Sequence, residues 1–188
     1  MAFESQAYGP VFGELISERR LNPLDGGVVN SQMAARLEAL TGPNAFAGHR
    51  VVDQTMADAC ISAVWLYHNF LDRSHTISQG ILSQTGSYWH GIMHRREPDF
   101  SNSKYWFRKV GDHPLFEDLN KEASAAAQEV EHAPNFLTTQ KAWDPAAFID
   151  LCAGALSGKS PVDALCREIQ QREWELLFDY SYRHALGK

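Results

Sequence analysis

The chain has 188 residues, of which 44% are hydrophobic and 11% aromatic, and its formal net charge is −6. This length suits a single domain, expected over residues 1–188, and the composition excludes extended disorder. No apolar run approaches the roughly 18 residues that cross a bilayer, and the first residues lack a signal-peptide pattern. We therefore expect a cytoplasmic protein that binds neither membranes nor, given its acidity, nucleic acid.

The three cysteines are Cys60, Cys152 and Cys166. They are odd in number and widely spaced, and none forms a CxxC pair, so the sequence indicates neither a disulfide framework nor a thiolate zinc site. We expect reduced thiols in core positions.

Cap signals divide the first half of the chain. The first thirty residues, which include Asp25-Gly26-Gly27, predict a short helix and an irregular arm. Asn30 is predicted to cap a helix that runs to about Leu40. A run with helical periodicity and no Gly or Pro before Gly80 predicts one long helix from about Thr55 to Ser83.

The second half has further start and stop signals. Helices are expected from Thr85 to Pro98, from a cap at Ser101 or Asn102 to Gly111, from Pro114 to Pro134, from Asp144 to Gly158 and from Ser160 to Gly187. Clean alternating strands and hairpin signals are missing. The predicted fold is all-α, a compact bundle or orthogonal array of six to seven helices.

Charge is unevenly distributed along the chain. Between His68 and His113 there are six cations and four anions, so this segment carries +2 and the remainder −8. A basic segment within an acidic protein suits a small anionic ligand better than a nucleic-acid backbone. The same numbers of cations and anions are also explained by a solvent-exposed surface on which the charges pair with one another.

Two sets of metal-competent side chains follow each other in this segment. The apolar stripe of the predicted long helix continues, at steps of four and three, into His68, Asp72 and His75. The next helix presents His90, His94 and Glu97 at the same spacing. A short loop favours an antiparallel pair in which the two faces meet. Buried polar groups need partners, a ligand or a metal.

The mixture of imidazole and carboxylate suits zinc, iron or manganese. The predicted metal ligands are His68, His90 and His94. Asp72 or Glu97 is expected either to bind the metal or to orient an imidazole. The predicted catalytic residues are His68, Asp72, His75 and Glu97.

Other interpretations of the histidines remain open. Neither set matches a specific motif such as HExxH, and Glu97 precedes Pro98, which disfavours helical geometry. A metal-free pocket with acid–base histidines explains the pattern, and so does a buried structural network.

Aromatic and charged side chains surround the histidines in sequence, as in small-molecule pockets. Arginine is suited to holding a carboxylate or phosphate by two hydrogen bonds. The predicted substrate-binding residues are Arg95, Arg96, Arg108, Tyr88 and Lys104. A lattice of Arg–Asp pairs between short helices is the competing interpretation.

The block GSYWHGIMHRREPDFSNSKYWFRKVGDHP, with YHNFLDRSHTISQ upstream, resembles a group of uncharacterised bacterial and fungal proteins of similar size. The likeness covers about residues 65–116. This group has no assigned activity, so the resemblance implies no catalytic role.

The sequence thus predicts a small helical enzyme that acts on a small anionic metabolite through its histidines and carboxylates, either with a bound metal or without one. A non-catalytic ligand-binding or sensor protein that uses the same pocket is one alternative. The other is a structural or interaction protein that forms a homodimer through an Ala-rich helix and a Trp174-Leu177-Phe178 stripe.

Overall fold

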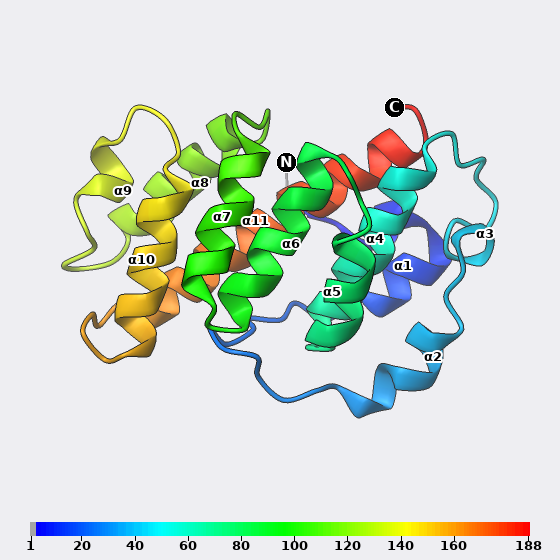
Figure 1. Cartoon of the computed structure of the whole chain (residues 1–188), viewed down its shortest axis with the longest axis horizontal. Helices are drawn as coiled ribbons and strands as arrows, with labels where there is room; N and C mark the ends of the chain where they lie inside the picture. Colours follow the sequence, from blue (N-terminus) through cyan, green and yellow to red (C-terminus); the bar gives the residue numbers. More distant parts are fainter. Residues whose placement is uncertain (1–2) are drawn as a thin grey trace.

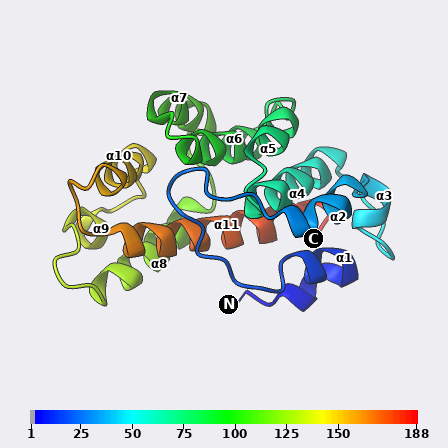
Figure 2. The ribbon, with the colours of Figure 1, turned by 90° about the horizontal axis from the view of Figure 1, so that it is seen from below.

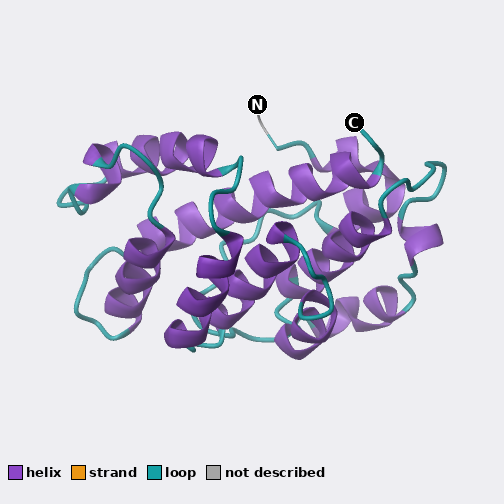
Figure 3. Cartoon of the chain, turned by 45° about the horizontal axis from the view of Figure 1, so that its top comes forward, coloured by secondary structure: helices purple, strands orange, loops and turns teal. Residues whose placement is uncertain are grey.

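The computed structural model describes residues 3–188, and within this range the chain consists of helices joined by loops, with no strand (Figures 1 and 3). The all-α prediction is therefore confirmed. Among these helices, none combines the length and the apolar character that a membrane crossing requires.

Short elements make up the first quarter of the chain. They are η1 (Ser5–Tyr8), α1 (Gly9–Leu15), η2 (Ser31–Met33), α2 (Ala34–Glu38) and α3 (Gly42–Ala45). The segment predicted as one helix from Asn30 to about Leu40 is helical from Ser31 to Glu38, but the predicted cap is wrong, because the Asn30 side chain makes no capping hydrogen bond. Its Nδ2 instead lies 3.1 Å from Nδ1 of His68. The segment forms a 3-10 turn followed by a short helix.

The long helix predicted from Thr55 to Ser83 is divided in two. α4 (Gln54–Tyr67) ends at His68, and α5 (Leu71–Ser78) begins three residues later. Asn69 has a left-handed conformation with φ of 65°. Its N–H donates to Leu66 O at 3.0 Å and that of Phe70 donates to Trp65 O at 3.0 Å, which is the Schellman pattern of helix ends. The two halves therefore do not share one helical face.

The remaining helices follow the predicted order more closely. They are α6 (Gln84–Arg96), α7 (Phe100–Val110), α8 (Phe116–Gln128), α9 (Phe136–Thr139), α10 (Pro145–Leu156) and α11 (Asp163–Ala185). Asp144 caps α10 as expected, with its carboxylate accepting from two backbone N–H groups. The cap of α7 is Asp99 rather than Ser101 or Asn102, since its carboxylate accepts from the N–H of Asn102 at 3.1 Å.

The long helix α11 runs through the middle of the molecule, with α5, α6 and α7 on one side and α1 on the other (Figure 2). Its aromatic side chains form the core, where the rings of Trp174 and Phe178 stack with centroids 4.9 Å apart. Exposed fractions are 4% for Trp174 and 0% for both Leu177 and Phe178. This stripe therefore packs inside the chain, and the predicted dimer contact through it is wrong.

The three cysteines are buried and unpaired. The prediction that they fill core positions as free thiols is confirmed.

Two glycines allow the helices around α6 to approach closely. A Cβ at Gly86 would lie 2.2 Å from the carbonyl oxygen of Ile81, in the turn between α5 and α6. A Cβ at Gly91 would lie 2.9 Å from the ring of Phe107 on α7. The absence of side chains at these positions thus sets how near α6 lies to its two neighbours.

We predict that Gly86→Ala lowers the free energy of unfolding by about 1–3 kcal/mol or more, because the methyl group meets backbone that cannot move aside. Urea denaturation followed by circular dichroism measures this change. Gly80→Ala is the matched control in the same turn, since its Cβ would lie 3.4 Å from the nearest atom, at ordinary contact distance. Equal stability of the two variants would contradict the prediction.

Candidate metal centre

Three histidines from two helices meet beside α7. His75 comes from α5, and His90 and His94 lie one turn apart on α6. One coordinating nitrogen from each ring lies within 4.8 Å of the other two. His90 and His94 are 2% and 5% exposed, whereas His75 is only partly buried. The cluster is therefore open to solvent mainly on the side of α5.

Helix α7 covers the two inner histidines. The ring of Trp106 packs against His90 with centroids 4.1 Å apart. Asn102 directs its Nδ2 at Nε2 of His94, at 3.1 Å. Helix α7 thus contributes an aromatic side chain and an amide donor to the surroundings of the cluster, but it contributes no metal-ligating side chain.

Hydrogen bonds restrict which nitrogen of each inner imidazole carries the proton. Nδ1 of His94 lies 3.1 Å from a carboxylate oxygen of Glu97, which only accepts, so Nδ1 is protonated. The Ser78 hydroxyl lies 2.9 Å from Nδ1 of His90 and 3.3 Å from the His75 carbonyl oxygen. If Ser78 donates to His75, it accepts from His90, and both imidazoles have their lone pair on Nε2. If it donates to His90, Nε2 of His90 carries the proton and donates to Nε2 of His94.

The two Nε2 atoms lie only 2.9 Å apart. In the first arrangement both are acceptors, and two lone pairs at this distance repel each other unless a cation lies beside them. In the second arrangement the two atoms share one hydrogen bond. The first arrangement is the one that can bind a metal ion through both rings.

Burial keeps these imidazoles neutral. It lowers the pKa of His90 to about 3, with the nearby His94, His75 and Lys109 contributing further. Burial also lowers the pKa of His94, against the opposing effect of Glu97. Neutral imidazole is the form that binds a metal ion.

His68 does not belong to this cluster, contrary to the prediction that it binds a metal with His90 and His94. Its Nε2 lies 2.9 Å from the carbonyl oxygen of Leu15, and its Nδ1 lies 3.1 Å from Nδ2 of Asn30. Both of these partners come from the N-terminal part of the chain, and His68 is not among the side chains whose nitrogens converge. The physical reason is that α4 ends before Asn69. His68 closes α4 and His75 lies on α5, so they do not share the helical face that their spacing predicted.

The two predicted carboxylates have different positions. Asp72 lies one turn before His75 on α5, but it is exposed and is not among the side chains that converge on the cluster. Glu97 is bonded to His94 and so orients this imidazole from outside the cluster. Of the two roles considered for Glu97, the geometry favours the orienting one.

Three of the five predicted substrate-binding residues are buried in the core, away from the histidine cluster. The prediction that they bind a substrate is therefore wrong. Arg95 pairs with Glu173 of α11, and both side chains are almost completely inaccessible. Arg96 donates to the carbonyl oxygen of Asp25 at 2.9 Å and to Oδ1 of Asn69 at 2.8 Å. Tyr88 is 1% exposed. These side chains hold the core together and are not available to a substrate.

The other two predicted binders are at the surface of α7. Lys104 pairs with Asp150 at 2.5 Å, and the guanidinium of Arg108 lies over the ring of Tyr105 at 5.8 Å. A cation that acts on the cluster is Lys109, which contributes to the lowered pKa of His90 and whose Nζ lies 4.1 Å from the Trp106 ring centroid. The sequence places Lys109 in the basic segment but does not indicate that it lies near the histidines.

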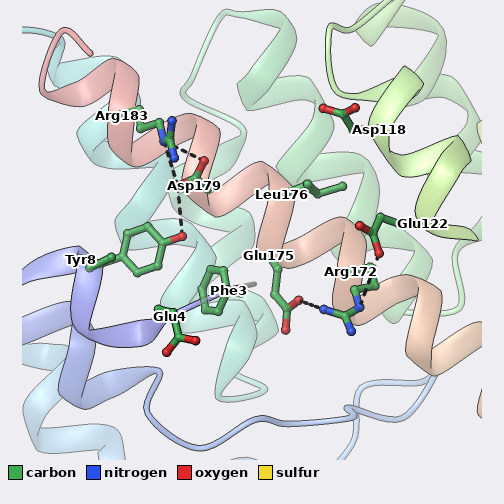
Figure 4. Close-up of a pocket in the computed structure, with 11 residues that line it drawn as sticks. Phe3, Glu4, Tyr8, Asp118, Glu122, Arg172, Glu175, Leu176, Asp179 and Arg183 are labelled. Carbon is green, nitrogen blue, oxygen red and sulfur yellow. Dashed lines mark hydrogen bonds and ion pairs between the residues drawn. The ribbon is translucent and has the colours of Figure 1, made fainter. Parts of the chain in front are cut away.

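A cavity of about 560 Å³ lies away from the histidines, between η1, α8 and α11 (Figure 4). Its apolar part includes Phe3 and Leu176, and five carboxylates line it against two arginines, Arg172 and Arg183. Both arginines form ion pairs with neighbouring carboxylates. This electrostatic environment opposes the binding of an anionic metabolite.

Comparisons with known proteins identify no relative: no protein-family model, curated protein or solved structure matches the chain.

His113, at the end of the basic segment, lies apart from the cluster. It is 2% exposed and packs edge-on against Tyr88 and Tyr180. Its Nδ1 accepts from the N–H of Leu115 at 3.3 Å. Burial, followed by the nearby His184, lowers its pKa from 6.5 to about 4, while Asp112 acts in the opposite direction.

A buried histidine with a lowered pKa makes folding sensitive to acid. Between pH 6.5 and about 4, the unfolded chain binds a proton that folded His113 does not, so stability falls as the pH falls. We predict that His113→Asn makes this decline shallower, by up to about 1.4 kcal/mol per pH unit. Urea denaturation at several pH values measures it. The exposed variant His49→Asn should keep the wild-type slope, and an unchanged slope in His113→Asn would contradict the prediction.

Proposed function

We propose that His75, His90 and His94 bind one divalent transition metal ion, and that the protein is a metal-dependent enzyme acting on a small anionic molecule. The observation that carries this proposal is the convergence of the Nε2 atoms of His90 and His94, 2.9 Å apart, with a third imidazole beside them. One metal ion binds both Nε2 atoms when each ring carries its proton on Nδ1.

The spacing of the nitrogens supports metal binding. At metal–nitrogen distances of about 2.0–2.1 Å, two ligands at angles of about 90–110° lie about 2.9–3.4 Å apart. The 2.9 Å between the Nε2 atoms falls within this range. Imidazole ligands suit zinc and iron, and they suit manganese less well without a carboxylate ligand. Zinc is therefore the first metal to test.

The surroundings of the ligands support the same proposal. Glu97 accepts from the distal nitrogen of His94, as carboxylates commonly do beside metal-bound imidazoles. The Ser78 hydroxyl has the corresponding role at His90 when it accepts from Nδ1. Such contacts set the orientation of each ring before a metal arrives.

Three protein ligands leave coordination positions open, as in catalytic rather than structural zinc sites. A metal ion in such a site polarises a substrate oxygen or lowers the pKa of a bound water. The positive metal ion, together with Lys109 beyond the Trp106 ring, favours an anionic substrate. The partly exposed side at His75 provides the access.

We predict that chelator-stripped protein takes up one zinc ion per chain and that His90→Gln and His94→Gln abolish this uptake. Titration calorimetry and elemental analysis of the desalted protein measure the stoichiometry. Circular dichroism shows whether each variant remains folded.

His68→Gln is the sharpest control, because His68 is as buried as His90 and is likewise hydrogen-bonded through its ring nitrogens. It is expected to retain full uptake, as is the exposed variant His49→Ala. Folded wild-type protein that takes up no zinc, iron or manganese would overturn the proposal. The proposal would also be overturned if His68→Gln lost zinc uptake while His90→Gln retained it.

We further predict that Glu97→Gln weakens zinc affinity about 10–100-fold without changing the stoichiometry, because the amide orients His94 less strongly than the carboxylate. Competition with a chromophoric chelator measures the affinity. Glu131→Gln is the matched control, since Glu131 lies 3.4 Å from His132 in an exposed pair away from the cluster. Equal affinities in the two variants would refute the orienting role of Glu97.

A further inference from the structure

We propose that the side-chain amide of Asn102 donates a hydrogen bond to an anionic ligand bound at an open position of the metal, and so makes this position selective for anions. The inference rests on the proposed function, because it places the ligand next to a metal held by His75, His90 and His94. It assigns to Asn102 a binding role that goes beyond metal ligation.

The argument begins with the lone pair on Nε2 of His94. Nδ2 of Asn102 lies 3.1 Å from this nitrogen and donates to it. A metal ion bound to His94 takes the same lone pair, and the amide N–H then loses its acceptor. A partly buried donor that loses its partner is costly unless another acceptor replaces it.

The replacement lies close at hand. A metal ion about 2.0–2.1 Å from Nε2 of His94 needs the space that the amide nitrogen occupies, so the Asn102 side chain has to turn aside. When the amide turns toward the adjacent open position, it comes within hydrogen-bonding reach of the ligand there, since adjacent ligands on one metal ion lie about 3 Å apart. It favours ligands that accept hydrogen bonds strongly, and anions accept more strongly than neutral molecules.

The backbone of Asn102 is held near α6 through Asp99. The Asn102 N–H donates to the Asp99 carboxylate at 3.1 Å, and the Asp99 N–H donates to the His94 carbonyl at 3.0 Å. These bonds keep the base of the side chain beside His94 and leave the amide free to rotate. Nearby, Ser103 donates to the carbonyl oxygen of Gly91 at 2.8 Å and fixes the start of α7 against α6.

The charges around this position agree with an anionic ligand. The Asp99 carboxylate is already engaged by the Asn102 N–H and by the Ser101 hydroxyl at 3.0 Å. Glu97 is directed at the far nitrogen of His94. Lys109 pairs with no carboxylate in the described part of the chain, and its charge remains available.

The test uses the full chain loaded with cobalt(II), whose visible spectrum reports on the ligands, and azide as the anionic probe. Azide titrations give the affinity for wild type, Asn102→Ala and Asn102→Asp. We expect azide affinity to fall about 10–100-fold in Asn102→Ala, the usual effect of losing a hydrogen bond to a charged group. In Asn102→Asp it should fall at least as far, because a carboxylate repels the anion. Cobalt stoichiometry should stay at one per chain.

Ser101→Ala is the control, since it removes a neighbouring hydrogen bond to Asp99 without touching the histidines. It should bind azide as wild type does. Cobalt bound in all variants with the same azide affinity in Asn102→Ala as in wild type would overturn this inference and leave the metal centre intact. Folded wild-type protein that binds no cobalt would overturn the proposed function, and this inference with it.

Discussion

The close approach of two imidazole nitrogens is the constraint on which the candidate site depends. Nε2 of His90 and Nε2 of His94 lie 2.9 Å apart, while Ser78 and Glu97 hold the opposite nitrogens of the two rings. Outside such a frame, the rings would be free to turn away from each other. Within it, both rings direct Nε2 at one point, and this is the arrangement that the proposed metal ion requires.

The fold imposes this constraint through a sharp turn and two close helix contacts. Gly86 lets the chain turn from α5 into α6 without a clash, so that His75 and Ser78 face His90. Gly91 lets the Phe107 side of α7 approach α6. The site therefore depends on backbone spacing as much as on the residues that it contains.

The sequence predicted the helical class and most of the later helices, because caps such as Asp144 and helical periodicity are local signals. The spacing of the histidines also predicted that the helix carrying His90 and His94 would face the preceding helical segment. The choice of His68 over His75 as a ligand failed at Asn69, whose left-handed turn is stabilised by tertiary contacts with Val28 and Arg96. The burial of Arg95 and Arg96 depends on α11 and the N-terminal arm, both distant in sequence, so no local pattern indicates it.

The Arg95–Glu173 pair has a consequence for how the proposed metal ion would be acquired. It fastens α6 to the central helix α11 from within the core, as does the hydrogen bond from Trp89 Nε1 to the Ser181 hydroxyl at 3.1 Å. With these anchors α6 is not free to roll about its axis, so two of the three imidazoles are in position regardless of metal. Under the proposed function, folding and metal loading are then separate events, and the metal ion would exchange through the α5 side while the rest of the chain keeps its shape.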